Sequence, residues 1–119
     1  MQVSRINERM TTDKTGAETT VHAADGKYTI AVDGETVGLA AVADRCNQRV
    51  FYHTEVDERF GGRGLATILV EQALEATRAD GKRVVATCSM VADFLKKHPE
   101  FSDIADPATP AILQWVETL

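Results

Sequence analysis

The segment that decides the fold is VDERFGGRGLA, residues 56–66, which lies between a strand-like run and a helix-like run. Its glycines let the backbone turn so that successive N–H groups point to one side, and they leave room for a bulky anion. The first turn of the following helix adds unpaired N–H donors and the positive end of the helix dipole. Arg59 and Arg63 add formal positive charge. The segment therefore predicts a binding loop for a phosphate or a diphosphate.

Two familiar phosphate loops do not fit this spacing. A Walker A loop requires Lys and then Ser or Thr after its last glycine, whereas Leu65 follows Gly64 here. A dinucleotide-binding fingerprint requires a third glycine where Thr67 stands, and it normally follows the first strand of a repeated βαβ unit. The pattern that remains is R-x-x-G-x-G-x-A, formed by Arg59, Gly62, Gly64 and Ala66.

Upstream of the loop, the apolar pattern predicts a hairpin followed by a third strand. Residues 28–32 alternate as a strand does, and Asp33-Gly34 is a strong signal for a tight turn before a partner strand at residues 37–42. A third strand is expected at residues 50–56. Side chains alternate between the two faces of a strand. This alternation predicts one face with Val50, Tyr52, Thr54 and Val56 and another with Phe51, His53 and Glu55.

Downstream of the loop, an apolar stripe predicts a helix over residues 65–79, ended by Asp80-Gly81. Residues 83–88 read as a buried strand, and Ser89 is expected to cap a helix over residues 90–98 that Pro99 stops. Thr109 and Pro110 predict the start of a last helix. The apolar side of that helix carries Ile112, Trp115, Val116 and Leu119, which would pack on the sheet or join subunits.

This order of elements predicts one mixed α/β domain over residues 27–119, built on a single sheet with flanking helices. Residues 1–26 are polar and rich in threonine, and they lack an apolar period. We therefore expect a flexible N-terminal arm over residues 1–26, with at most a short edge strand around Val21.

The composition limits the classes of function. The chain has 119 residues and a net charge of −5, with a pI of about 5.1, which fits one domain and argues against a nucleic-acid binder. Cys46 and Cys88 form no C-x-x-C pair, so neither a cysteine zinc site nor a disulfide scaffold is indicated. No signal peptide is evident, and no apolar run approaches the ~20 residues that span a bilayer. We expect a cytoplasmic protein with no metal, nucleic-acid or membrane partner.

The loop and three further segments together resemble the GNAT superfamily of acyl-CoA-dependent N-acetyltransferases, in particular its very short acetyltransferase-like subgroup. The further segments are HTEV at residues 53–56, Cys88, and FLKKHPEF at residues 94–101. The resemblance covers roughly residues 28–103, and it implies acetyl-CoA as cosubstrate and a sheet that is splayed where the cofactor strands part. The cofactor-binding residues it implies are Val56, Arg59, Gly61, Gly62, Arg63, Gly64, Leu65, Ala66 and Lys97.

Within that resemblance, each part of CoA has an expected position. The diphosphate lies on the backbone amides of residues 62–66, and the pantetheine arm runs beside Glu55 and Val56, which brings the thioester close to Cys88. Lys96, Lys97 or Arg63 would meet the 3′-phosphate, although for either lysine a solvated helix charge is an equally good interpretation.

Three side chains compete for a role in the chemical step. Cys88 precedes a predicted helix N-terminus, a position that favours thiolate, and it either takes the acetyl group covalently or lines the pocket. His53 and Glu55 share one strand face, and either could deprotonate an ammonium directly or through water. Glu55 lies closer to the predicted splay and is the better candidate for a base or an amine anchor.

The sequence departs from larger members of the superfamily in two respects. Phe94 is the aromatic residue nearest to the place of their general-acid tyrosine, and a phenyl ring cannot donate a proton. The helices that wall their acceptor side are missing, so we expect an open site for an exposed amine of a protein, a peptide or a small molecule.

The leading prediction is therefore an acetyl-CoA-dependent N-acyltransferase that is a monomer or a weak homodimer. The alternatives are a CoA-binding or interaction module with little turnover, and a thioesterase that uses Cys88.

Overall fold

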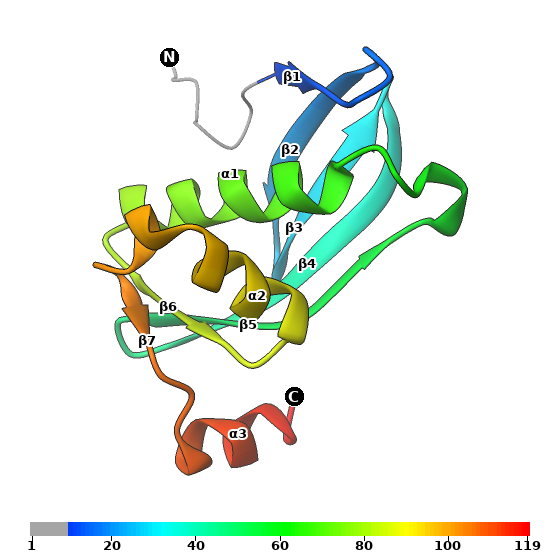
Figure 1. Cartoon of the computed structure of the whole chain (residues 1–119). Helices are drawn as coiled ribbons and strands as arrows, with labels where there is room; N and C mark the ends of the chain where they lie inside the picture. Colours follow the sequence, from blue (N-terminus) through cyan, green and yellow to red (C-terminus); the bar gives the residue numbers. More distant parts are fainter. Residues whose placement is uncertain (1–9) are drawn as a thin grey trace, which may run out of the picture.

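The computed structural model describes residues 10–119 (Figure 1). Its strands are β1 Met10–Thr12, β2 Glu18–Ala24, β3 Lys27–Val32, β4 Glu35–Arg45, β5 Gln48–Val56, β6 Arg83–Ala86 and β7 Ala105–Asp106. Its helices are α1 Leu65–Ala79, α2 Ser89–Lys97 and α3 Pro110–Val116, with 3₁₀ turns η2 Glu58–Phe60 and η3 Pro99–Phe101. The predicted mixed α/β class is confirmed, and α1 has the predicted bounds.

The described strands form one sheet in which spatial order follows chain order from β1 to β7. Neighbours are antiparallel from β1 to β5, and β6 and β7 continue the sheet in parallel. Asp33 and Gly34 join β3 to β4 with φ angles of +48° and +89°, which is the primed hairpin turn that the sequence predicted. Within residues 10–119, no helix has the length and apolar character needed to cross a bilayer.

β5 and β6 separate after a short paired stretch. Their register runs from Gln48 opposite Arg83 to Phe51 opposite Ala86. The amides of Thr87 and Cys88 then both donate to the carbonyl oxygen of Phe51, at 3.0 and 3.2 Å. β5 continues to Val56 with β4 as its ladder partner. This confirms the expected splay, and we call the opening between residues 52–56 and residues 87–88 the β5–β6 fork.

The predicted N-terminal arm is sheet in its described part, which corrects the sequence interpretation. Residues 1–9 lie outside the described residues, but residues 18–24 form β2, which pairs with β3 from Thr19 to Ala24. Thr19 and Val21 are fully buried there. The expected short edge strand around Val21 is thus a seven-residue strand between β1 and β3. Its extent was missed because threonine, which suits a β-strand as well as valine does, lowers the apolar signal of the segment.

A β-bulge in β5 corrects the predicted faces of this strand. Val42 lies opposite Phe51 while Ala41 lies opposite His53, so Tyr52 is an extra residue. The bulge reverses the alternation, because Phe51 and Val56 pack in the main core on the α1 side, whereas Val50 packs in a second cluster. His53 and Glu55 therefore do not share a face with Phe51.

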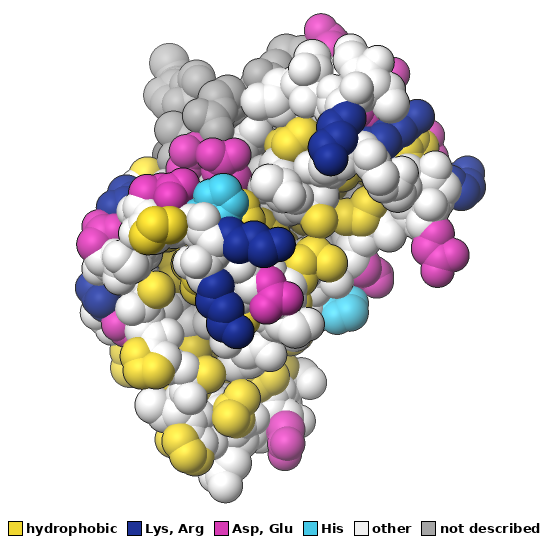
Figure 2. Space-filling view, in the orientation of Figure 1, with side chains coloured by type: hydrophobic (Ala, Val, Ile, Leu, Met, Phe, Trp, Pro, Cys, Tyr) yellow, Lys and Arg dark blue, Asp and Glu magenta, His cyan; other side chains and the backbone are white. Residues whose placement is uncertain are grey.

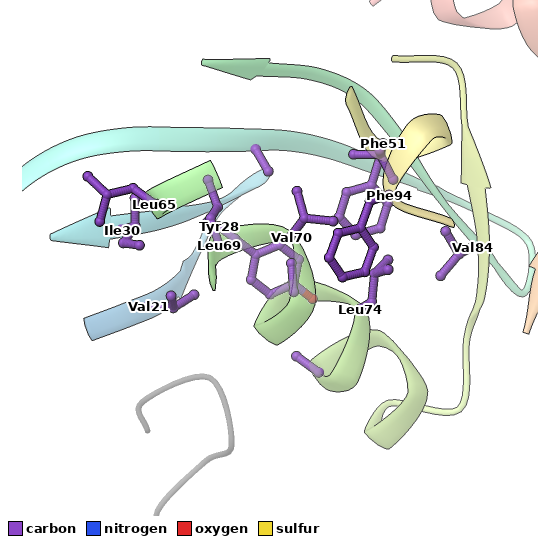
Figure 3. Packing of buried hydrophobic residues seen from close by; sticks show 14 of the residues in the cluster. Val21, Tyr28, Ile30, Phe51, Leu65, Leu69, Val70, Leu74, Val84 and Phe94 are labelled. Carbon is purple, nitrogen blue, oxygen red and sulfur yellow. The ribbon is translucent and has the colours of Figure 1, made fainter. Parts of the chain in front are cut away.

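α1 covers one face of the sheet and fills the main core (Figure 3). Leu65, Leu69, Val70 and Leu74 meet apolar residues of β2, β3, β5 and β6, including Ile30 and Phe51. On the other face, Ile112 of α3 packs against Val50 and Val85, with Trp115 and Val116 beside them. Three residues of the predicted stripe, Ile112, Trp115 and Val116, thus pack on the sheet, which is one of the two predicted outcomes. The fourth, Leu119, lies beyond the end of α3 and is exposed. Thr109 caps this helix as predicted, since its hydroxyl accepts from the amide of Ile112.

Candidate functional site

The loop between β5 and α1 has the backbone of an anion-binding turn. Asp57 begins it by accepting a hydrogen bond from the amide of Arg59 at 2.9 Å, which caps η2. Gly62 and Gly64 both adopt φ of +78°, in the left-handed region that favours glycine. Gly64 is also the N-cap of α1, and it has no side chain to occupy the first amides of the helix.

The free N–H groups of this loop begin at Gly62. The amide of Gly61 already donates to the carbonyl of Glu58 at 3.1 Å, so the predicted contact from Gly61 would not use its N–H. Within residues 10–119, the amides of residues 62–66 donate no hydrogen bond. A Cβ atom placed on Gly62 would have no atom within 4 Å, so the loop faces open space at this point. These features fit the binding of a phosphate group.

The two loop arginines are already paired with carboxylates. Arg59 binds Asp57 at 2.7 Å and Glu35 at 3.4 Å, and its side chain and amide hold the pKa of Asp57 below its usual range. Arg63 donates to Asp13 at 3.4 Å, and its guanidinium lies 4.8 Å from the centre of the Phe60 ring. The sequence predicted their position beside the loop correctly but did not show that their charges are engaged.

Cys88 lies at the β5–β6 fork. It is the N-cap residue of α2, one position before the predicted cap Ser89, and it is partly buried. Its thiol donates to the hydroxyl of Thr54 at 3.4 Å. Thr54 alternates along β5 with His53 and Glu55, so its side chain points to the opposite face from theirs. The structure therefore places Cys88 away from the two predicted bases.

His53 and Glu55 come together on the outer face of β5, which α1 does not cover. The His53 Nε2 atom lies 3.4 Å from Glu55 Oε2, and each side chain is more than half exposed, at 58% and 57%. A carboxylate beside an imidazole, open to water and next to the fork, can accept a proton from an arriving ammonium group. The structure thus brings together two of the three predicted catalytic candidates.

The described residues form three cavities, of which the largest borders the fork at Glu55 and Val56. A cavity of about 200 Å³ between α1 and α2 is lined by Ala66, Thr67, Met90 and Lys97, among others. A larger one, of about 580 Å³, is lined by β3, β4 and the end of β5, including Glu55, Val56, Asp57 and Glu58. A third, of about 360 Å³, surrounds Arg49 at the opposite end of β5. Figure 2 shows Lys and Arg side chains over the start of α1 and over α2.

Sequence reasoning missed the contribution of the β1–β2 turn, residues 13–17, to this site. Asp13 pairs with Arg63, and the Lys14 amide donates to the Arg63 carbonyl at 3.0 Å. The run DKTG at residues 13–16 carries Asp and Gly at the first and fourth positions of a type I turn, which was the available signal.

Comparisons with known proteins agree with this geometry. The family model described as GCN5-related N-acetyl-transferase matches residues 27–104. No curated protein is similar enough in sequence to match the chain. Among solved structures, a GCN5-like protein from Staphylococcus aureus, determined in solution by NMR, is similar with a TM-score of 0.58 and 20% sequence identity. The similarity covers 76% of this chain and 90% of that one. At this identity the likeness shows the fold alone.

Proposed function

The chain belongs to the GCN5-related N-acetyltransferase family, and we propose that it transfers an acetyl group from acetyl-CoA to an amine. The observation that carries the proposal is the combination of free amides at residues 62–66 with the β5–β6 fork beside them. The amides suit a diphosphate, and the fork leaves strand backbone exposed for an extended, amide-containing arm.

Different residues of this chain contact different parts of CoA. We propose that the amides of residues 62–66 hold the diphosphate, with Arg59 and Arg63 at its edge. Val56, at the end of the half of β5 that lacks β6, contacts the pantetheine arm. Lys97 lines the smaller cavity together with Ala66, which supports a contact with the 3′-phosphate end of the molecule. Acetyl-CoA supplies a thioester, which a neutral amine converts to an amide with release of the CoA thiol.

The acceptor amine enters through the larger cavity. That cavity opens beside Glu55 on the outer face of β5 and carries the carboxylates of Glu55 and Glu58, while the third carboxylate in its lining, Asp57, is paired with Arg59. These carboxylates attract the ammonium form of an amine, and Glu55, beside His53, takes the proton that must leave before the nitrogen attacks. Because the cavity is open, we propose an exposed amine of a protein, a peptide or a small molecule. The free cysteines fit the reducing cytoplasm in which we propose that the protein works.

One observation favours a second candidate function, a CoA-binding module with little turnover. The resemblance implies that Phe94 is the aromatic residue nearest to the place of the proton-donating tyrosine of larger members, and its buried ring stacks on His98 with centroids 3.9 Å apart. No proton donor therefore replaces that tyrosine at this position, and the leaving CoA thiolate would take its proton from water.

Binding and turnover can be tested separately. CoA at about 100 times its Kd should stabilise the fold by about 2.7 kcal/mol, which raises the melting temperature by roughly 10 °C. A screen of amines that monitors free CoA thiol should then show release that depends on the acceptor. Binding without release supports the module, and release without an acceptor indicates hydrolysis. The absence of any melting shift at millimolar CoA would refute both proposed functions.

Replacement of Cys88 tests covalent transfer. Because the sulfur contacts Thr54 and neither His53 nor Glu55, we expect Cys88→Ser to keep CoA binding and most of the turnover. Intact-mass analysis of the native protein after incubation with acetyl-CoA should show no acetyl group on Cys88. An acetyl adduct that disappears in Cys88→Ser, together with lost turnover, would instead make Cys88 the nucleophile.

A further inference from the structure

We propose that Lys14 provides the free positive charge that binds the diphosphate of CoA, so that the β1–β2 turn forms a second wall of the diphosphate site. This inference rests on the proposed function. It adds a residue from outside the segment that matches the family, since that match begins at residue 27.

Lys14 lies directly against the start of α1. Its amide donates to the carbonyl of Arg63 at 3.0 Å, which fixes its backbone to the loop. Its side chain then runs across Gly64: a Cβ atom placed on Gly64 would lie 3.3 Å from the Lys14 Cε atom and 3.6 Å from Cγ. The lysine stem therefore crosses the N-cap of α1, next to the free amides of residues 62–66.

The turn that carries Lys14 is held in place by a buried carboxylate. The Asp13 side chain is fully buried and accepts from the Thr15 hydroxyl at 2.6 Å, the Thr15 amide at 2.8 Å and the Ala17 amide at 3.1 Å. Arg63 adds a fourth donor. These bonds, with that from the Thr15 hydroxyl the strongest, lower the pKa of Asp13 and keep it ionised at neutral pH. The Lys14 backbone is thus positioned before any ligand arrives, which reduces the entropy lost on binding.

The two arginines of the loop and Lys14 of the β1–β2 turn differ in whether their charges are available to a ligand. Arg59 is paired with Asp57 and Glu35, and Arg63 with Asp13. Within residues 10–119, the Lys14 ammonium has no ion pair or hydrogen bond. A phosphate would have to compete with carboxylates for either arginine, whereas Lys14 can turn its compact charge toward the ligand at no such cost. Lys14 is therefore the cation best able to meet the diphosphate.

The positions of Lys14 and Lys97 indicate that they meet different phosphate groups of CoA. Lys14 lies over Gly64, beside the free amides, whereas Lys97 lines the cavity between α1 and α2. We therefore assign Lys14 to the diphosphate and not to the 3′-phosphate.

The assignment is tested by calorimetry at low ionic strength with three ligands. The first is CoA, the second is dephospho-CoA, which lacks the 3′-phosphate, and the third is pantetheine, which lacks the diphosphate. Lys14→Ala should weaken CoA and dephospho-CoA equally, by about tenfold, because a charge-assisted contact to phosphate is lost. The affinity of the Lys14→Ala variant for pantetheine should equal that of the native protein. The control is Lys82→Ala, which removes the same charge near the far end of α1, where Lys82 pairs with Asp44. This control should bind all three ligands as the native protein does.

The outcomes separate this inference from the function on which it rests. Unchanged CoA affinity in Lys14→Ala, with normal binding by the native protein, would overturn the role of Lys14 and leave the proposed function intact. A loss confined to CoA would place Lys14 at the 3′-phosphate and overturn the assignment to the diphosphate. If the native protein binds neither CoA nor dephospho-CoA, the proposed function itself fails. Lys14 is exposed, so the variant should melt as the native protein does without ligand.

Discussion

Gly62→Val should abolish the stabilisation of this protein by CoA. The valine side chain would project into the open space in front of Gly62, where no protein atom lies within 4 Å of an added Cβ and where the diphosphate is proposed to bind. The substitution would also place a β-branched residue at φ of +78°, which costs about 1–2 kcal/mol. The measurement is the melting temperature with and without CoA at a concentration that saturates the native protein.

Gly81→Val is the matched control for this experiment. Gly81 has φ of +73° and also has no atom within 4 Å of an added Cβ. It follows the other end of α1, about 22 Å along the helix from the loop. Both variants should therefore lose similar stability from backbone strain, but Gly81→Val should keep the full shift with CoA. An equal shift in both variants would refute the assignment of the diphosphate to the loop.

The backbone turn of the β5–α1 loop and helix α1 could be predicted from the sequence because both are local. Gly62 and Gly64 mark the backbone that turns, and the apolar period from Leu65 marks the helix that follows. The fork was also expected, but only from the resemblance, since no local pattern shows where β5 and β6 stop pairing. Cap positions and strand ends differed by a few residues, as with Cys88 in place of Ser89.

The features that escaped prediction depend on contacts between distant parts of the chain. Asp13 meets Arg63 across 50 residues of sequence, with Lys14 beside it, and the paired β1 and β2 bring both residues there. The bulge at Tyr52 is likewise invisible in β5 alone, because it is defined by the register with β4. An alternating pattern assigns faces correctly only as long as the register does not slip.

The same long-range contacts change how the loop charges are understood. Two arginines beside glycines look like phosphate ligands in the sequence, yet each lies against a carboxylate in the fold. Arg63 thereby acts as a link between the loop and the β1–β2 turn, and through it the turn presents Lys14. The segment first interpreted as an arm thus becomes part of the proposed cofactor site.

Glu55→Gln should reduce turnover by about a hundredfold while leaving CoA binding unchanged. Glutamine keeps the size of the side chain but cannot accept the proton of the amine, and general-base catalysis contributes roughly 10²–10⁴-fold. We place the effect at the lower end because His53, 3.4 Å away, can partly replace the carboxylate through water. The measurement is the rate of acceptor-dependent release of CoA thiol, with the melting shift by CoA confirming an intact fold and cofactor site.

Glu58→Gln separates a chemical role of Glu55 from a general effect of negative charge. Glu58 lines the same cavity and carries the same charge, but it has no contact with His53 among the described residues. If Glu55 is the base, Glu58→Gln should at most raise the KM of a cationic acceptor, because it weakens attraction and leaves the proton transfer intact. Similar losses of kcat in both variants would show that the two carboxylates act only through their negative charge. The base would then have to be His53 or water.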